Sequence, residues 1–284
     1  MIGLIAHSEK SDARGAVRAM VAALKEAGIE YALEKYTAAL IGRKSSRDER
    51  ALARESELLV VLGGDGTILR VVHKLAADIR PIFGVNIGSL GFLTCVGPAE
   101  IPRAVESLLN KDYILSPRNL LRAELTHATG RTSRLHGLND VVISRGERSQ
   151  LVKIEVRIDG AELTHYNADG LIIATPTGST AYSISAGGPV LMPDSGAFVV
   201  TPICPHVLTN RSTVVSDRSV IEAQLLRPEK QVFVTVDGQS TLAMRVGDIL
   251  RIVKSDRSLP LVTLPERSFP EVLRQKLKWS GSNV

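Results

Sequence analysis

The apolar residues in the first third of the chain alternate between short continuous runs and helical spacing. Residues 2–6, 58–62 and 81–85 form runs with the length of buried strands. One helix face between the first two runs is marked by Val17, Met20, Val21 and Leu24. Gly28 is well placed to end that helix. Strands that alternate with helices predict a parallel sheet covered by helices on both faces.

Two further helices are expected in the same region. Residues 46–49 (Ser-Arg-Asp-Glu) have capping-box spacing and predict a helix that runs through Ala53. The residues at 68–72 predict a helix directly after the second apolar run. Helical spacing recurs once more in Ala104, Val105, Leu108 and Leu109.

After about Pro117 the pattern changes to alternation in period two. Residues 151–158 alternate apolar and polar side chains, and Asp159-Gly160 follows as a hairpin turn signal. Strands and turns continue through residues 232–253, so this region is predicted to be β-rich, as a sandwich or layered sheets. Residues 268–271 then predict a capped helix through Trp279, which we expect to return to the first domain. The predicted domains are 1–117, 118–264 and 265–284.

Composition narrows the class of protein. The chain has 284 residues, of which 44% are hydrophobic and 23% are charged, which fits a globular protein with a sizeable core. The net charge of +5 fits a phosphate-rich small ligand as well as nucleic acid, but basic residues are scattered and aromatic residues are only 4%. We therefore expect no nucleic-acid partner.

The cysteines and the lack of long apolar runs bear on the compartment. Cys95 and Cys204 are isolated and fit reduced, buried thiols. No apolar run approaches the roughly 18 residues that span a bilayer, and the first residues lack a signal-peptide pattern. The sequence predicts a cytoplasmic protein with no membrane association.

The loop at residues 63–67 (Gly-Gly-Asp-Gly-Thr) carries the first chemical signal. It joins a predicted strand to a predicted helix, which points backbone N–H groups at an anion, and Gly63, Gly64, Gly66 and Thr67 would form a phosphate loop. Asp65 would repel a phosphate unless it binds a hydroxyl or works with a metal ion. This favours a general base for a sugar hydroxyl beside a metal–nucleotide. The alternative is an ordinary turn in which Asp65 caps the helix.

A second cluster lies at residues 169–189. Small hydroxyl side chains crowd behind an apolar strand and could bind ribose, amide and phosphate groups, or could merely cap the next helix. They are Thr177, Ser179, Thr180, Ser183 and Ser185, together with Tyr182. Asn139-Asp140 lies at the edge of another predicted strand. This pair could form hydrogen bonds with the base edge and hydroxyls of a nucleoside, or could merely close a turn.

Several of these segments together resemble the NAD kinase family, in the same order over nearly the whole chain. The GGDGT element is shared with diacylglycerol-type lipid kinases and, more loosely, with phosphofructokinases, whereas the stretch 169–189 is much more specific. The matching segments are residues 63–67, 84–93, Asn139-Asp140, 169–189, Pro205-His206 and Asp237-Gly238-Gln239.

This resemblance implies a fold and a reaction. The fold would be a Rossmann-like N-terminal α/β domain with a parallel sheet, a β-rich C-terminal domain with the NAD site between the two, and a C-terminal helix. The reaction would transfer the γ-phosphate of ATP to the 2′-hydroxyl of the adenosine ribose of NAD, giving NADP. Mg²⁺ would arrive on the ATP phosphates with no metal ligands from the protein, and the chains would form homodimers or homotetramers.

The resemblance also implies residue roles. Asp65 would accept the hydroxyl proton, Gly66 and its neighbouring glycines would cradle phosphate, and Arg70 would meet phosphate. Asn139 and Asp140 would bind the adenosine portion. The other residues expected to contact NAD are Asn167, Asp169 (at the nicotinamide end), Thr177, Thr180, Ala181, Tyr182, Ser183, Ser185 and Gln239. Asn167 and Gln150 depart from the family, which more often has basic or imidazole side chains there, and Arg211-Ser212 replaces a usual Arg-Pro.

Two other functions compete. A lipid kinase could use the same loop, but the hydroxyl-rich cluster suits a polar dinucleotide better than a lipid. A sensor module could bind NAD(P) without catalysis, and the presence of Asp65 disfavours it.

Overall fold

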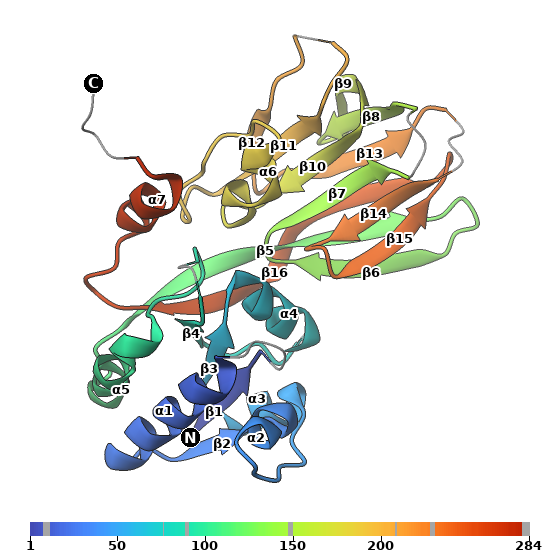
Figure 1. Cartoon of the computed structure of the whole chain (residues 1–284). Helices are drawn as coiled ribbons and strands as arrows, with labels where there is room; N and C mark the ends of the chain where they lie inside the picture. The colour runs from blue at the N-terminus through green and yellow to red at the C-terminus, as the bar shows by residue number, and fades with distance from the viewer. Residues whose placement is uncertain are drawn as a thin grey trace. The chain divides into compact units, whose positions relative to one another are not determined.

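The computed structural model describes residues 1–7, 12–75, 77–88, 91–146, 150–207, 209–227 and 231–279 (Figure 1). Contacts divide the chain into two compact units, Met1–Pro117 with Leu259–Val284, and Arg118–Ser258. The chain therefore leaves the first unit after Pro117 and re-enters it after Ser258. The division into an α/β domain (1–117), a β-rich NAD-binding domain (118–264) and a C-terminal helix that packs on the first domain (265–284) stays a prediction.

The sheet of the first unit is parallel, as predicted. Strands β1 (Ile2–Ala6), β2 (Tyr31–Leu33), β3 (Leu58–Gly63) and β4 (Ile82–Asn86) pair in the order β2-β1-β3-β4. The predicted strands are confirmed, and the pattern missed only β2, whose three residues are too short to show a period.

Helices cover both faces of this sheet. Helices α1 (Ala13–Glu26) and α5 (Ile101–Asn110) contact each other and share a core with one face of the strands. On the other face, a Cβ placed on Gly3 would lie 2.9 Å from Leu52, and one on Gly84 would lie 2.9 Å from Ile68. Leu52 belongs to α3 (Glu49–Glu55) and Ile68 to α4 (Asp65–Leu75), so these two helices cover that face. The short helix α2 (Lys35–Leu40) precedes α3.

Two details of the helix predictions are corrected. The cap of α3 is Asp48, whose carboxylate accepts a hydrogen bond from the Ala51 N–H at 2.7 Å, and not Ser46. Asp48 is the cap because it directly precedes the first helical residue and has the extended backbone of an N-cap. In α5, Leu109 does not belong to the buried face, because its side chain is 52% exposed and Ile101 takes its place in the apolar stripe.

The second unit is a β-sandwich, which confirms the predicted β-rich region. One sheet has the antiparallel order β12-β11-β10-β7-β14-β15. Its strands are β7 (Asp140–Arg145), β10 (Gly170–Ala174), β11 (Ala197–Ile203), β12 (Thr213–Ser216), β14 (Val232–Val236) and β15 (Ser240–Met244). The facing strands are β6 (Thr132–Gly137), β8 (Val152–Ile158), β9 (Ala161–Ala168) and β13 (Ile221–Leu225), with parts of β5 and β16. Apolar side chains from both sheets form one core.

The hairpin turns form as predicted. Asp159 and Gly160 between β8 and β9 have φ of 52° and 83°, and Asp237 and Gly238 between β14 and β15 have φ of 50° and 65°. Two successive residues with positive φ give the turn whose twist matches that of paired strands.

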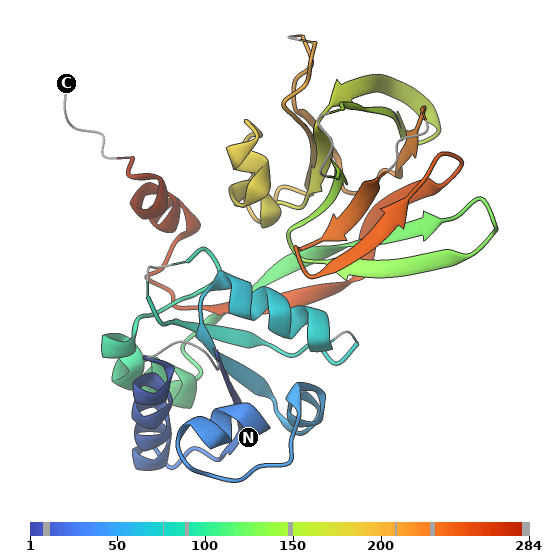
Figure 2. The ribbon, with the colours of Figure 1, turned by 45° about the vertical axis from the view of Figure 1, so that its right-hand side comes forward.

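The longest strands were not predicted at their full length. Strands β5 (Ile114–Thr126) and β16 (Ile249–Thr263) pair with each other (Figure 2), and each has residues in both units. The pattern predicted only residues 249–253 of β16, because the polar residues 254–258 and Pro260 interrupt its apolar alternation.

Helix α7 (Phe269–Leu277) opens with the predicted capping box, in which Ser268 and Glu271 bond each other's backbone N–H groups. It ends earlier than predicted because Lys278 adopts a φ of 54°, and Trp279 beyond it is 56% exposed. Of the two cysteines Cys95 is buried, but Cys204 is exposed, contrary to the prediction, because it lies just past the end of β11. Within the part of the chain that the structure describes, no helix has the length and apolar character needed to cross a bilayer.

Candidate active site

Asp65 lies at the first position of α4, directly after the loop that ends β3. Its Oδ2 accepts a hydrogen bond from the Phe92 N–H at 2.8 Å, and its Oδ1 accepts one from the Leu93 N–H at 3.0 Å. A Cβ on Gly91 would overlap this carboxylate, so any larger residue there would displace it. The side chain is therefore fixed by a distant segment and does not serve as the cap of its own helix. Each oxygen keeps a lone pair for another donor.

The glycines of the loop differ in their surroundings. Gly63 is buried, and a Cβ there would overlap Thr67, whose side chain is also buried. The Gly64 carbonyl accepts the Thr67 N–H at 2.9 Å and so starts the helix. Gly66 is exposed, with open space where a Cβ would stand. Gly66 is thus the member of the predicted phosphate loop that an anion could approach most closely.

The end of β4 lies beside this loop. The Ile87 N–H donates to the Gly63 carbonyl at 3.1 Å, and the Asn86 side chain donates to the Gly88 carbonyl at 2.8 Å. Parallel strands end at the same edge of a sheet, which is where ligands bind in open α/β sheets. Ser89 and Leu90, which belong to the segment resembling the family, lie outside the described residues.

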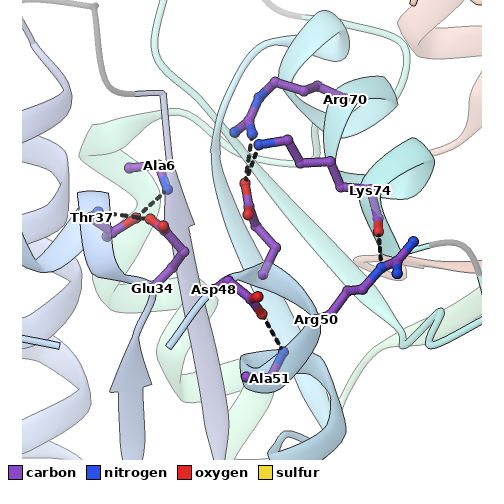
Figure 3. A network of polar contacts seen from close by, with 9 residues as sticks. Ala6, Glu34, Thr37, Asp48, Arg50, Ala51, Arg70 and Lys74 are labelled. Atoms are coloured by element: carbon purple, nitrogen blue, oxygen red, sulfur yellow. Dashed lines mark hydrogen bonds and ion pairs between the residues drawn. The ribbon is translucent and has the colours of Figure 1, made fainter. Parts of the chain in front are cut away.

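Arg70, one turn beyond the loop, is held by an acidic side chain (Figure 3). Its Nη1 donates to Glu49 Oε1 at 2.7 Å, and Lys74 Nζ donates to the same oxygen at 3.2 Å. Burial alone would raise the pKa of the Glu49 carboxyl, but hydrogen bonds from Arg70, from the backbone N–H of Glu49 itself and from Lys74 together outweigh burial and lower that pKa. These ion pairs connect α3 to α4. They also place Glu49 against the Arg70 guanidinium, the group that was predicted to bind phosphate.

A second polar network in Figure 3 fixes the end of β1. The Ala6 N–H donates to Thr37 Oγ1 at 2.8 Å, and Glu34 Oε2 accepts from the N–H and the hydroxyl of Thr37 at 2.9 and 3.1 Å. Since β1 neighbours β3, these contacts hold the same edge of the sheet.

The second unit contains a pocket of about 430 Å³ on its own surface. It brings together four residues that were predicted to bind NAD, namely Asn139, Asp140, Ala181 and Tyr182. The other lining residues are Val142, Ser144, Thr235, Asp237 and Gly238. Val142, Ser144 and Thr235 lie on the less buried face of β7 and β14, and of the three only Ser144 and Thr235 mark this face in the sequence by a polar side chain.

Asp237 organises one wall of this pocket. Its carboxylate accepts hydrogen bonds from the N–H groups of Leu138, Asn139 and Asp140 at 2.7, 2.8 and 3.0 Å. Burial and the adjacent Asp237 charge raise the pKa of the Asp140 carboxyl to about 7. Near neutral pH Asp140 therefore exists in both forms and can donate or accept a hydrogen bond.

The hydroxyl-rich loop is tied to the same wall. The Thr175 N–H donates to the Asn139 carbonyl at 2.8 Å, and the Thr175 hydroxyl donates to the Leu138 carbonyl at 2.6 Å. A Cβ on Gly178 would overlap the Asn139 backbone. The loop and the Asn139 turn therefore form one unit of structure.

Some hydroxyls of this loop bond within the protein. Ser183 is fully buried and lies 3.0 Å from the Thr201 hydroxyl, and Thr180 donates to the Thr177 carbonyl at 3.1 Å. Thr177 is buried, while Tyr182 and Ser185 of the short helix α6 (Tyr182–Ser185) are exposed. Tyr182 and Ser185 therefore remain the accessible candidates here.

Three other predicted residues do not line this pocket as far as the structure describes the chain. Asp169 accepts a hydrogen bond from Arg145 Nε at 2.6 Å. The Asn167 carbonyl accepts the His206 N–H at 2.9 Å, and Gln239 is exposed in the β14–β15 turn. Their part in binding stays a prediction.

Comparison with known proteins identifies the family. A family model described as the ATP-NAD kinase N-terminal domain matches residues 2–113, and one described as the ATP-NAD kinase C-terminal domain matches residues 138–264. The chain is 42% identical to a protein named NAD kinase from Syntrophotalea carbinolica over 279 residues, which cover 98% of each chain. It is 41% identical to the NAD kinase of Geotalea daltonii, over 93% of each chain. The chain belongs to the ATP-NAD kinase family.

Solved structures of NAD kinases share the fold. The structure of yeast NADH kinase complexed with NADH matches with a TM-score of 0.90 at 26% identity, covering 100% of this chain and 89% of that one. An NAD kinase from Archaeoglobus fulgidus in complex with ATP matches with a TM-score of 0.76 at 27% identity, covering 98% and 99%. The predicted resemblance to the NAD kinase family and the prediction of a kinase are both confirmed, which removes the lipid kinase and the sensor module as alternatives.

Proposed function

We propose that this chain transfers the γ-phosphate of ATP to the 2′-hydroxyl of the adenosine ribose of NAD, with Asp65 as the proton acceptor. The observation that carries the proposal is the Asp65 carboxylate, which two backbone N–H groups hold beside the open Gly66 in a chain of the ATP-NAD kinase family. A fixed carboxylate with free lone pairs is suited to accept a hydroxyl proton.

Most of the rate enhancement would come from positioning and neutralisation of charge, since phosphoryl transfer needs little covalent help from the protein. The open backbone at Gly66 and the N-terminus of α4 would receive phosphate oxygens. Proton acceptance by Asp65 would add roughly 10²- to 10⁴-fold.

The pocket of the second unit would hold the adenosine portion of NAD. Its volume of about 430 Å³ lies in the range of small-molecule sites. Asn139 and Asp140 offer an amide and a carboxyl group for the base, and Tyr182 offers an exposed ring for stacking. Asp169 would bind the nicotinamide end.

Mg²⁺ would reach the site bound to ATP. In the described residues, the group of side chains with suitable spacing for a metal ion is Glu155, Glu162 and His165 on the β8–β9 hairpin, and it is not at the loop. Asp65 is the carboxylate nearest in sequence to the phosphate loop, and both its oxygens already accept N–H groups. The proposal has the metal held chiefly by the phosphate oxygens of ATP, as is usual for Mg²⁺ at nucleotide sites. The proposal also includes a cytoplasmic homodimer or homotetramer, which the family resemblance supports.

Incubation of the purified chain with NAD and Mg-ATP tests the proposal. We expect NADP, detected by an NADP-specific dehydrogenase, and no phosphorylated product with diacylglycerol as acceptor. Absence of NADP with ATP, polyphosphate and a range of divalent metals, despite binding of NAD, would contradict the proposal.

A further inference from the structure

The segment that holds Asp65 lies outside helices and strands. Phe92 and Leu93 donate their N–H groups to the carboxylate, and the Gly91 N–H donates to Thr94 Oγ1 at 2.9 Å. Leu93 is buried but Phe92 is only half-buried. An irregular segment keeps one conformation only if neighbouring elements pack on it, so the surroundings of Phe92 bear on the position of Asp65.

Helix α7 supplies the side chains against Phe92. The ring centres of Phe269 and Phe92 lie 6.3 Å apart with an angle of 41°, a favourable tilted arrangement. Lys276 Nζ lies 5.8 Å from the centre of the Phe92 ring, within the range of a cation–π contact. Phe269 and Lys276 are seven residues apart, which places them on the same face of the helix.

The connection into α7 is fastened to the residues that follow Phe92. The Leu264 N–H donates to Cys95 Sγ at 3.3 Å. Arg267 Nη2 donates to both carboxylate oxygens of Glu100 at 3.0 and 3.1 Å. These contacts hold the residues before α7 against the β4–α5 connection. They thereby place Phe269 and Lys276 of α7 next to Phe92.

The helix contributes little to the core. Leu273 is its buried residue, and a pocket of about 590 Å³ remains between α7 and the β4–α5 connection, lined by Gly88, Gly97 and Val272 among others. A helix that buries so little is poorly explained by stability alone. Two of its side chains, Phe269 and Lys276, contact Phe92 in the segment that fixes Asp65.

We infer that Phe269 is a positioning residue for Asp65, acting through Phe92, with Lys276 in support. The inference rests on the proposed role of Asp65. Loss of the Phe269 ring lets Phe92 move, the two N–H groups then shift, and the carboxylate loses its fixed direction. Displacements of about 1 Å can cost on the order of 100-fold in rate.

The test compares steady-state kinetics and melting temperatures of five proteins: wild type, Phe269→Ala, Phe269→Tyr, Leu273→Ala and Asp65→Asn. Phe269→Ala is expected to lower kcat by about 10- to 100-fold with KM for NAD and ATP little changed. Phe269→Tyr keeps the ring and should restore kcat. Leu273→Ala removes the buried side chain of the same helix, so it should lower the melting temperature without lowering kcat below that temperature.

The outcomes separate two kinds of failure. If Phe269→Ala keeps the wild-type kcat, or loses no more than Leu273→Ala, the positioning role is wrong. If Asp65→Asn keeps wild-type turnover, Asp65 is not the base and the inference loses its premise; if the wild type forms no NADP, the proposed function itself is wrong. If Phe269→Ala does not fold, Lys276→Ala takes its place, with a smaller loss of kcat expected and an unchanged kcat contradicting the inference.

Discussion

Asp65 and Asp140 are carboxyl groups in opposite surroundings. Asp65 receives two backbone N–H groups, whereas at Asp140 the nearby N–H groups are taken by the neighbouring Asp237. Burial and the Asp237 charge then keep the pKa of Asp140 near neutrality. The Asp65 carboxylate is held in a fixed direction, whereas Asp140 can exchange a proton with its surroundings near neutral pH.

Substitution of Gly91 by alanine tests whether the position of the Asp65 carboxylate matters for catalysis. The added methyl would overlap the carboxylate, so we expect kcat to fall about 100-fold while the fold is retained. Gly15→Ala is the matched control, because its Cβ would stand in open space on the exposed side of α1. A Gly91→Ala enzyme with wild-type kcat would show that the position of Asp65 does not limit the rate.

The raised pKa of the Asp140 carboxyl can be tested by comparing the free energy of unfolding of Asp140→Asn and the wild type at different pH. The pKa of about 7 lets native Asp140 keep its proton up to near neutral pH, whereas in the unfolded chain the carboxyl loses it near its ordinary pKa of 3.8. The native state therefore binds more protons in this window, and the wild type loses stability as pH rises from about 4 to 7. We expect urea unfolding to show Asp140→Asn gaining stability relative to the wild type over that range, with a constant difference above it. A difference that does not vary with pH would contradict the raised pKa.

The elements that were predicted from sequence are those with a local cause. The Asp159-Gly160 turn and the Ser268 capping box follow from residues that are adjacent in the chain. The length of β16 follows instead from pairing with β5, β13 and β4, which are distant in sequence. The site divides in the same way. The loop at Asp65 could be predicted from its glycines. The N–H groups that fix the Asp65 carboxylate could not, because they belong to Phe92 and Leu93, which are 27 and 28 residues away in sequence.

The ion pairs of Glu49 between α3 and α4 predict a pH-dependent contribution to the free energy of unfolding. Glu49→Gln removes the charge that pairs with Arg70 and Lys74, and should cost about 1–3 kcal/mol of unfolding free energy at pH 7. Because the pKa of Glu49 is lowered, this stabilisation is present above about its ordinary 4.5 and is lost as pH falls through the native value. Urea unfolding of both proteins between pH 3 and 8 measures it.

Kinetics of the same pair of residues separate the two roles of Arg70. If Arg70 also meets phosphate, Arg70→Ala should raise KM for ATP, whereas Glu49→Gln leaves Arg70 in place and should not. Equal effects of both substitutions on KM would mean that Arg70 acts only through the α3–α4 contact.

At the scale of the whole molecule, the predicted chemistry is divided between the two compact units. The loop with Asp65 belongs to the first, and the pocket with Asn139 and Asp140 belongs to the second. The chain passes from one unit to the other within β5 and again within β16. Sequence periodicity indicated the change of fold class near Pro117, but the polar residues 254–258 did not indicate that the chain returns to the first unit within the continuous strand β16.

The most direct test of the account is the Asp65→Asn enzyme, studied by NADP formation in a single turnover and by calorimetric titration with NAD. The account predicts that the rate of phosphoryl transfer falls by about 10²- to 10⁴-fold, because the proton acceptor is gone, while the dissociation constant for NAD stays near that of the wild type. Wild-type turnover by Asp65→Asn would contradict the assignment of Asp65 as the base.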